Sequence, residues 1–473
     1  MAKMTRRDLL AAATAAGLAA ATAGRALGQT ASSGTASSGT AGSGPAPATG
    51  AAPVAAAAGN VQALNVAIIG AGDHGRQLIF QCMKLPGLRF RAVCDIWDYS
   101  RDYAARLLRK YKHPVNEYVD YRDMLAKEKG LDAVIIASPD GFHAEQAIAC
   151  LAAGAGVYLE KEMALTIADC RRIVQAAGKA GKCLQVGRQH RSNLRYMRAL
   201  EYVDDKKALG RITHVAAQWH GHRRDKVTWL EKFAIDKARL AEYGFDSMEQ
   251  FCNWRYFAKF APGEMASLGS HQIDVFNWFL HALPTSVYAA GGRDYYDYYE
   301  LYDNISGIYE WDYDWSARKT KVRGTYEINN TTEMGGFFET FTGSEGELQI
   351  SEIATRGGLW RDVTAPLAPW EEQLQARAVK EYGPQAYGPI AFAEGGGPPQ
   401  PTYGARAYGP IPAQDSQSVY WHHLRNFFNA IRGSEKLTCP GEVGFAAAVA
   451  CLKADESMKL GKRLELSAED YKV

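Results

Sequence analysis

Short apolar runs alternate with amphipathic stretches between residues 65 and 187. The runs have the length of buried strands, and the stretches between them have the period of helices. Continuous apolar strands separated by helices are typical of a parallel sheet covered on both faces. We therefore predict a doubly wound α/β domain over residues 61–187. Its strands are expected at Val66–Ile69, Phe90–Cys94, Ala133–Ala137, Val157–Leu159 and Leu184–Val186, and its helices at Arg76–Leu85, Glu145–Ala153 and Ile167–Ala177.

The pattern changes after residue 190, where strand-like runs follow one another with few helices between them. This indicates an α+β domain over residues 188–473 with a large, open, mostly antiparallel sheet. One face should lie on helices, and a free face that needs covering favours a homo-oligomer. Residues 361–412 are rich in Pro, Gly, Ala and Tyr and predict an irregular insertion. The strands are expected at Ile212–Trp219, Ser286–Ala290, Ile305–Tyr309, Val322–Ile328, Phe337–Thr342 and Glu347–Ile350, and the helices at Ser267–His281, Val419–Ile431 and Glu442–Lys459.

The first 60 residues carry an export pattern and then a low-complexity stretch. Arg6 and Arg7 precede an alanine-rich apolar run over Leu9–Ala23, which is too short to favour a membrane-spanning helix. We predict a twin-arginine signal peptide over residues 1–28, recognised by the twin-arginine export machinery, and a periplasmic or secreted protein. An uncleaved N-terminal anchor is the alternative. Residues 29–60 repeat Ala-Ser-Ser-Gly-Thr twice and predict a disordered linker, because they offer almost nothing to bury.

Charge, cysteine content and histidine spacing argue against nucleic-acid binding, disulfides and a metal site. The net charge is only +2, from 54 basic and 52 acidic residues, which argues against a nucleic-acid-binding protein. The eight cysteines form no C-x-x-C pair and mostly lie in apolar patterns, so we expect buried thiols without disulfides. His220-Gly221-His222 has no further acidic or cysteine ligand at set spacing, and we predict no metal site.

A glycine-rich turn follows the first predicted strand and opens the first predicted helix. Its G-x-G-x-x-G spacing lets backbone amides approach a pyrophosphate at the helix N-terminus. Asp95 ends the second strand, 25 residues after Gly70. A carboxylate there accepts hydrogen bonds from a ribose and repels a 2′-phosphate, which favours NAD over NADP, although Arg101 could soften that preference. The cofactor contacts are expected at Gly70, Gly72, Asp73, His74, Gly75 and Asp95.

Two further strand ends carry residues suited to the nicotinamide side of the crevice. Ligands of open parallel sheets bind at the carboxyl ends of the strands. Lys161 could stabilise a developing alkoxide during hydride transfer, whereas an ordinary surface ion pair is its alternative reading. A simple proline-terminated turn is the alternative for the segment that begins at Ser138. The contacts expected here are Ser138, Pro139, His143, Glu160 and Lys161.

The helix expected at Ser267–His281 offers a proton acceptor. Ser267, His271 and Asp274 share one helix face by their spacing, and a histidine in this position could take a hydroxyl proton. Its alternative is a satisfied core histidine. Substrate contacts are expected at Gln189, Arg191, Trp254, Arg255 and His271, for which structural roles are the alternative.

These motifs, in this order, resemble the glucose–fructose oxidoreductase/inositol dehydrogenase family (Gfo/Idh/MocA) from about Asn65 to the C-terminus. The resemblance implies a Rossmann domain, a C-terminal domain with a large open sheet, and NAD(P)-dependent chemistry, mostly on sugars and cyclitols. It matches Lys161 to the lysine of the family's Glu-Lys-Pro motif and His271 to the histidine of its Asp-x-x-x-His motif. It also matches the cofactor positions to Gly70, Gly72, Gly75 and Asp95, and the residues near the nicotinamide to Ser138, Pro139 and Glu160.

Two positions depart from the family pattern. Glu162 stands where the family usually has proline, and Ser267 stands where it usually has the aspartate that assists the histidine. Asp274, one helical turn further on, is a candidate substitute for that carboxylate. Asp274 is therefore counted with Lys161 and His271 as a candidate catalytic residue.

Three functions follow from these patterns. The first is an exported NAD(P)-dependent oxidoreductase that acts on a ring hydroxyl of a sugar, cyclitol or sugar derivative. Because a nucleotide made in the cytosol would have to be folded in before export, we expect the cofactor to be held tightly. The second is a redox-neutral enzyme that cleaves or epimerises a sugar and recycles its NAD. The third is a non-catalytic sugar-binding protein.

Overall fold

The computed structural model describes residues 61–221, 226–316, 318–332, 334–353, 355–373 and 417–473, and the backbone of 405–407. The predicted signal peptide and linker, and most of the predicted 361–412 insertion, lie outside these residues. Within the described residues, none of the helices has the length and hydrophobicity that crossing a bilayer requires.

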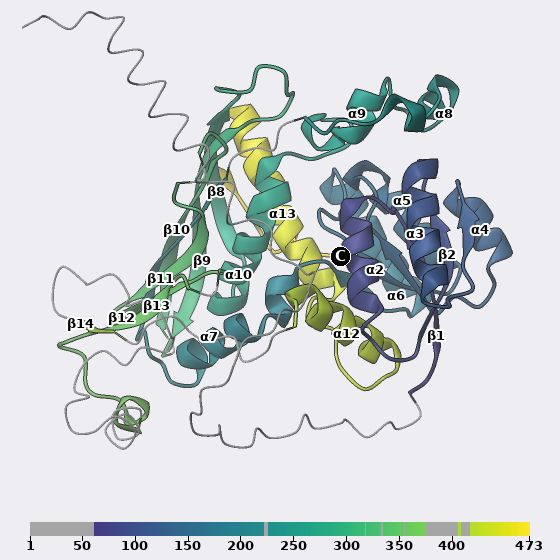
Figure 1. The fold of residues 1–473 in the computed structure, drawn as a ribbon. Helices are drawn as coiled ribbons and strands as arrows, with labels where there is room; N and C mark the ends of the chain where they lie inside the picture. The colour runs from purple at the N-terminus through teal and green to yellow at the C-terminus, as the bar shows by residue number, and fades with distance from the viewer. Residues whose placement is uncertain are drawn as a thin grey trace, which may run out of the picture. The chain divides into compact units, whose positions relative to one another are not determined.

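The N-terminal domain is a Rossmann fold, as predicted. Six parallel strands lie in the order β3-β2-β1-β4-β5-β6 and carry helices on both faces (Figure 1). The order reverses between β1 and β4. Ligands of open parallel sheets bind outside the carboxyl ends of the strands at such a point, and we call this region the crevice. The strands are β1 (Leu64–Ile69), β2 (Leu88–Cys94), β3 (Asn116–Tyr118), β4 (Ala133–Ile136), β5 (Gly156–Leu159) and β6 (Leu184–Val186). The helices are α2 (Asp73–Cys82), α3 (Asp98–Lys110), α4 (Tyr121–Lys127), α5 (His143–Ala152) and α6 (Ile167–Ala180).

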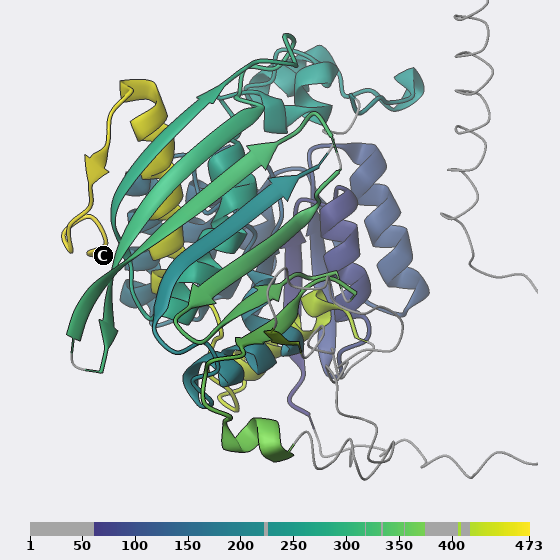
Figure 2. The same ribbon diagram turned by 90° about the vertical axis from the view of Figure 1, so that its left-hand side faces the viewer.

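The C-terminal domain is built on a nine-stranded sheet in the order β14-β13-β12-β11-β7-β10-β9-β8-β15. It is antiparallel except where β7 and β10 pair in parallel, so the predicted mostly antiparallel sheet is confirmed. Figure 2 shows the sheet from its open side, with helices behind it. The strands are β7 (Ile212–His220), β8 (Pro284–Gly292), β9 (Asn304–Trp315), β10 (Arg318–Asn329), β11 (Phe337–Gly343), β12 (Gly346–Ile350), β13 (Gly358–Asp362), β14 (Ala405–Ala407) and β15 (Leu464–Glu465).

Long helices pack between the two sheets. They are α7 (Leu194–Asp204), α10 (Ser270–Leu280) and α13 (Gly441–Leu460), and α13 contacts both β8 and α6 (Figure 1). One hydrophobic core runs through these helices and includes residues of both sheets, such as Val157 and Phe341. The domains are therefore joined by a continuous packed interface, which fixes the two sides of the crevice relative to each other.

Helix α12 (Val419–Ile431) belongs to the Rossmann core although it lies near the end of the chain. Leu424, Phe427 and Phe428 are fully buried in the same cluster as Leu64 and Val66. The C-terminal segment thus returns to complete the N-terminal domain.

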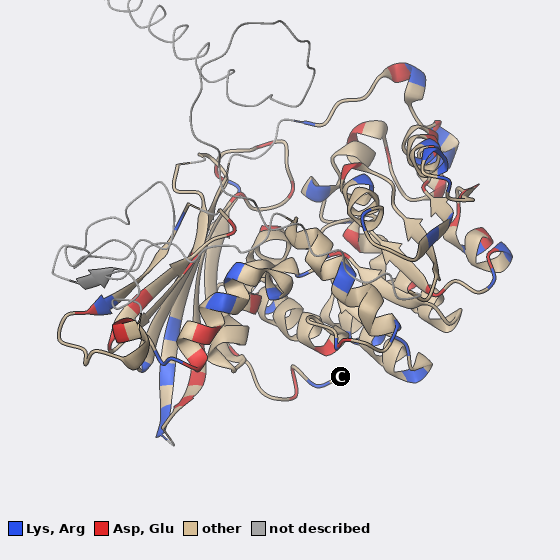
Figure 3. Ribbon diagram, turned by 60° about the horizontal axis from the view of Figure 1, so that its bottom comes forward, with Lys and Arg blue, Asp and Glu red and all other residues tan. Residues whose placement is uncertain are grey.

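The open face of the large sheet is polar and charged. Lys and Arg lie next to Asp and Glu along its strands (Figure 3), and Arg323 pairs with Glu310 at 2.9 Å. Tyr288 and Ile308 are the large apolar side chains exposed on β8 and β9. Homo-oligomerisation through this face stays a prediction.

Residues 226–262, between β7 and α10, form a separate segment that we call the strap. It contains η3 (Glu231–Phe233), α8 (Lys237–Glu242), α9 (Met248–Cys252) and η4 (Trp254–Tyr256). Its apolar side chains form a small cluster of their own that packs on Ile96, Trp97 and Phe142 of the Rossmann domain. Figure 1 shows α8 and α9 beyond the end of the Rossmann domain, on the side of α3 and α5.

Candidate functional site

The glycine turn leaves open space at the N-terminus of α2. A Cβ atom on Gly70 would lie 2.6 Å from the Ala137 backbone, and one on Gly75 would lie 2.0 Å from the Gly70 carbonyl oxygen. Gly70 also has φ +89°, which favours glycine. A Cβ atom on Gly72, by contrast, would meet nothing within 4 Å. Two glycines are therefore required by packing, and the third leaves room for a phosphate to reach the backbone amides.

Asp95 lies where the sequence places the ribose contact. Its carboxylate accepts hydrogen bonds from the backbone N–H groups of Ala71 (2.7 Å) and Trp97 (2.8 Å), and burial raises its pKa. Arg101 donates to the Asp95 carbonyl oxygen and pairs with Asp98 at 2.8 Å. Since the Arg101 charge is already neutralised, the site suits NAD better than a nucleotide with a 2′-phosphate.

His74 and Glu160 form an ion pair across the crevice. The His74 Nε2 atom lies 2.9 Å from the Glu160 Oε1 atom. Burial lowers the pKa of His74, but the Glu160 carboxylate outweighs it and the net pKa is raised. A Cβ atom on Gly187 would lie 2.8 Å from the Glu160 carboxylate, so this glycine makes room for it. The pair links the glycine turn to the end of β5.

His143 and Ser138 tie neighbouring loops together. His143 is fully buried, with Nε2 2.9 Å from the Ser138 carbonyl oxygen and Nδ1 2.7 Å from the Glu162 carbonyl oxygen. The Ser138 hydroxyl donates to Gln146 at 2.6 Å. Through these contacts His143 joins the loop that follows β4 to the loop that follows β5, which is a structural role.

Lys161 reaches from the Rossmann domain to the C-terminal domain. Its Nζ atom donates to the carbonyl oxygen of Ser267, one helical turn before His271. Burial lowers the pKa of the Lys161 amine, and Arg255 acts in the same direction against the carboxylate of Asp140. The two residues that the sequence matched to catalytic motifs are thus brought to one place.

His271 is a buried imidazole. Burial, followed by the positive charge of Lys161, holds its pKa well below the usual value. Its Nδ1 atom has no hydrogen-bond partner among the described residues. A neutral histidine with a free ring nitrogen can accept a proton.

Asp274 is paired with Arg191. Its carboxylate accepts two hydrogen bonds from Arg191, at 2.7 and 3.0 Å, and Arg191 also lies over the Trp278 ring. The pair borders a pocket of about 360 Å³ that is lined by α10 and α13 residues rather than by Lys161 or His271. Asp274 and Arg191 are thus paired with each other, and their catalytic and substrate-binding roles stay predictions.

The remaining predicted substrate residues differ in position. Gln189 is buried and its amide lies 3.5 Å from the Tyr420 hydroxyl. Trp254 and Arg255 lie on the strap, with the guanidinium 4.2 Å from the Trp254 ring centre. The Arg255 charge opposes the protonated forms of both His74 and Lys161, although the net pKa of His74 is raised.

Sequence reasoning missed several buried charges around the site. Asp140 is almost fully buried beside Lys161, and burial raises its pKa to about 6. The sequence signal that could have identified Asp140 is its position directly after Ser138-Pro139. Glu162 and Arg188 are both fully buried and pair at 3.1 Å, and nothing in the sequence links them. The Lys161–Glu162 peptide bond is cis.

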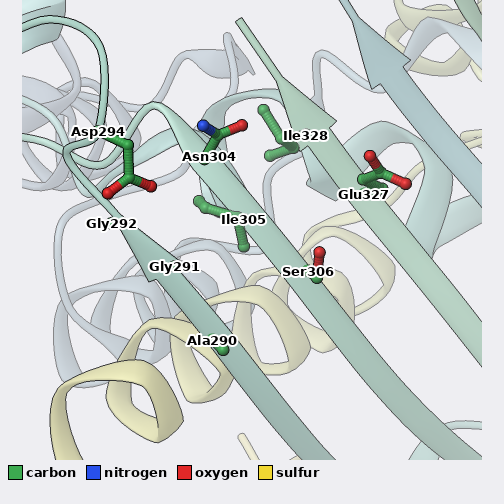
Figure 4. A pocket seen from close by; sticks show the side chains of 9 residues that line it. All are labelled: Ala290, Gly291, Gly292, Asp294, Asn304, Ile305, Ser306, Glu327 and Ile328. Atoms are coloured by element: carbon green, nitrogen blue, oxygen red, sulfur yellow. The ribbon is translucent and has the colours of Figure 1, made fainter.

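A separate pocket of about 390 Å³ lies on the large sheet at the ends of β8, β9 and β10 (Figure 4). Asp294, Asn304, Ser306 and Glu327 supply its polar side chains. None of the residues predicted to bind cofactor or substrate lines it.

Two family models match most of the described chain. Residues 64–188 match the oxidoreductase family with an NAD-binding Rossmann fold (GFO/IDH/MocA), and residues 196–349 match the GFO/IDH/MocA C-terminal domain. Together they match more than half of the chain.

Curated relatives match over less than a third of this chain. The inositol 2-dehydrogenase of Salmonella typhimurium is 34% identical over 146 residues, which is 30% of this chain and 41% of that protein. A glycosyl hydrolase family 109 protein of a Shewanella species is 30% identical over 130 residues, covering 26% of this chain and 28% of that protein. The matched part is thus less than half the length of these relatives.

Solved structures share the whole fold. The WlbA dehydrogenase of Bordetella pertussis, in complex with NADH and UDP-GlcNAcA, has a TM-score of 0.61 at 19% identity, over 86% of this chain and 99% of that one. The aldose–aldose oxidoreductase of Caulobacter crescentus has a TM-score of 0.63 at 16% identity, over 86% and 100%. These likenesses establish the two-domain architecture.

Proposed function

Because the chain belongs to the GFO/IDH/MocA oxidoreductase family, whose Rossmann domain binds NAD, we propose that it is an exported oxidoreductase acting on sugars. It oxidises a ring hydroxyl of a sugar, cyclitol or sugar derivative and keeps its cofactor tightly bound. The inositol 2-dehydrogenase relatives support a polyhydroxylated ring as substrate. The Arg6-Arg7 segment supports export of the folded protein with its nucleotide.

The observation that carries this proposal is the meeting of Lys161 and His271. The lysine ammonium donates to the Ser267 carbonyl oxygen, one helical turn before His271, and the His271 Nδ1 atom has no hydrogen-bond partner among the described residues. A substrate hydroxyl between them would donate its proton to His271, while Lys161 stabilises the negative charge that develops on the oxygen. Bound NAD supplies the hydride acceptor. Gly70, Gly72 and Gly75 would hold its pyrophosphate and Asp95 its ribose.

The strap supports tight retention of the cofactor. It contacts the segment directly after Asp95, where the Trp97 Nε1 atom donates to the Phe233 carbonyl oxygen at 2.6 Å. Arg239 pairs with Asp98 at 2.8 Å. The strap also contacts the turn after β4, since the Gly141 N–H donates to the Phe260 carbonyl oxygen at 3.0 Å. A dinucleotide lying along these strand ends would leave only after the strap moved.

We expect protein purified without added nucleotide to carry close to one NAD per chain, measured by mass spectrometry after denaturation. Phe245 stacks on Phe260 in the strap, at 4.2 Å between ring centres. Phe245→Ala should loosen the strap and lose most of the NAD during prolonged dialysis. Leu348→Ala truncates a fully buried side chain in β12, so this variant should lose stability while keeping its NAD.

Two outcomes would contradict this expectation. An empty wild-type protein would rule out tight retention and would favour the non-catalytic sugar-binding function. Equal NAD loss in both variants would show that the strap does not hold the nucleotide, and it would leave the rest of the proposal standing.

Redox-neutral glycoside cleavage or epimerisation is the second candidate. It needs another acid or base besides the Lys161–His271 pair, and buried Asp140 beside Lys161 supplies one. The family 109 glycosyl hydrolase relative also favours it. Solvent deuterium incorporated at the carbon next to the oxidised centre would distinguish this chemistry from simple oxidation.

A further inference from the structure

His190 forms a buried ion pair behind the candidate site. It lies in η2 (Gln189–Ser192), is 2% exposed, and stacks on Tyr196 with ring centres 4.7 Å apart. Its Nε2 atom lies 3.0 Å from the Oε1 atom of Glu352. Glu352 follows β12, and its side chain is 26% exposed, so this pair connects the interior to solvent.

His190 also contacts the ring of His271. The rings of His190 and His271 lie 5.1 Å apart at 74°, and the Nδ1 atoms of both lack a hydrogen-bond partner among the described residues. The carboxylate that the family usually places before this histidine is replaced by Ser267, and Asp274 is bound to Arg191. His190 is therefore the titratable group in ring contact with His271.

We infer that His190 and Glu352 are positioning residues that keep His271 uncharged and ready to accept the substrate proton. The inference rests on the proposed function, which gives His271 the proton-accepting role. It extends that function by placing a histidine–glutamate pair beside His271, where the family usually has an aspartate, and this pair acts on the His271 pKa in the opposite direction. A neighbouring aspartate would stabilise the protonated histidine, whereas a neighbouring cation destabilises it.

The charges around each ring agree with this assignment. Burial lowers the pKa of His190, but Glu352 outweighs it, with further help from Glu339 and Asp274, and the net pKa is raised. Glu339 accepts a hydrogen bond from Tyr196 at 2.7 Å, and burial raises its pKa to about 7. The His190 ring thus faces carboxyl groups on three different elements, of which Glu352 raises its pKa the most.

His271 faces cations instead. After burial, the groups that lower its pKa are Lys161, His190, Arg188 and His74, in that order. When the substrate O–H bond breaks, the proton goes to His271 and the electron pair stays on the oxygen beside Lys161. The protonated His271 is then repelled by His190, so it releases the proton readily and returns to its neutral form.

The test is an NMR titration of the histidine rings in the full protein with bound NAD, which needs no substrate and no turnover. Glu352→Gln removes the counter-charge of His190, so the pKa of His190 should fall by at least one pH unit. Neutral His190 no longer repels a proton on His271, so the pKa of His271 should rise by about one pH unit. His190→Asn should raise the pKa of His271 to the same extent, and Glu352→Asp should restore part of the wild-type behaviour.

A matched control lies on the open sheet face, where His220 lies 3.3 Å from Glu327. Glu327→Gln removes the carboxylate of this pair and should leave the titration of His190 and His271 unchanged. A His271 resonance that stays the same in Glu352→Gln and His190→Asn, at every pH at which the protein is folded, overturns the inference. Since turnover is not measured, this result would leave the proposed oxidation untouched.

Discussion

Lys161→Met should abolish turnover while leaving bound NAD in place. Methionine keeps most of the apolar stem of lysine but removes the ammonium that donates to the Ser267 carbonyl oxygen. Without this charge nothing stabilises the developing alkoxide, and a loss of roughly 10²–10⁴-fold is the usual effect of removing such a group. Reduction of bound NAD by a panel of inositols and aldoses, followed by nicotinamide absorbance, measures the loss.

Lys259→Met is the matched control for this experiment. Lys259 also donates its Nζ proton to a backbone carbonyl, that of Gly244, but it lies on the exposed side of the strap. This variant should keep both its activity and its nucleotide. Full activity in Lys161→Met would remove Lys161 from the mechanism, whereas loss of NAD from that variant would give it a cofactor-binding role instead.

The Rossmann domain was largely predictable because its strands carry their own pattern. Val66–Ile69 and Ala133–Ala137 are continuous apolar runs, and the structure buries them as the central strands β1 and β4. Strand β3 was missed because Asn116-Glu117-Tyr118 is short and polar and pairs only at the sheet edge. Helix α3 was missed as well, since its buried positions are a serine, two alanines and a single leucine.

The C-terminal domain shows what local pattern cannot determine. The strands at Ile212–Trp219 and Val322–Ile328 were expected, but their parallel pairing depends on the whole sheet. The helix at Val419–Ile431 was predicted with its correct bounds, yet only the tertiary fold shows that it packs on the Rossmann domain. Pattern identifies a buried face, but it does not identify the partner of that face.

The same distinction applies to the candidate site. The glycine turn and Asp95 could be predicted because strand, turn and helix are contiguous in sequence. Asp274 was assigned to His271 from helical spacing, whereas the structure pairs it with Arg191, 83 residues earlier. No spacing rule connects residues that far apart. The Glu162–Arg188 pair, 26 residues apart, was missed for the same reason.

That pair gives the second large expected effect, this time on stability. Glu162 stands where the family usually has proline, and both side chains are fully buried. Both carboxylate oxygens of Glu162 accept from the Arg188 Nη2 atom, which also donates to the Gly444 carbonyl oxygen. Arg188→Ala would leave a carboxylate buried without its counter-charge, and the free energy of unfolding should fall by about 3–5 kcal/mol. Urea denaturation followed by circular dichroism measures this change.

The double variant Glu162→Gln/Arg188→Met separates the cost of an unpaired charge from the value of the pair itself. Burying two ions is expensive, and replacing such a pair with uncharged groups of similar volume is often close to neutral. The double variant should therefore recover much of the stability that Arg188→Ala loses. Arg323→Ala removes an exposed partner of Glu310 and should cost at most about 1 kcal/mol. If Arg188→Ala proved no worse than Arg323→Ala, the buried carboxylate would have to be neutral, and Glu162 would not be the ionic partner of Arg188.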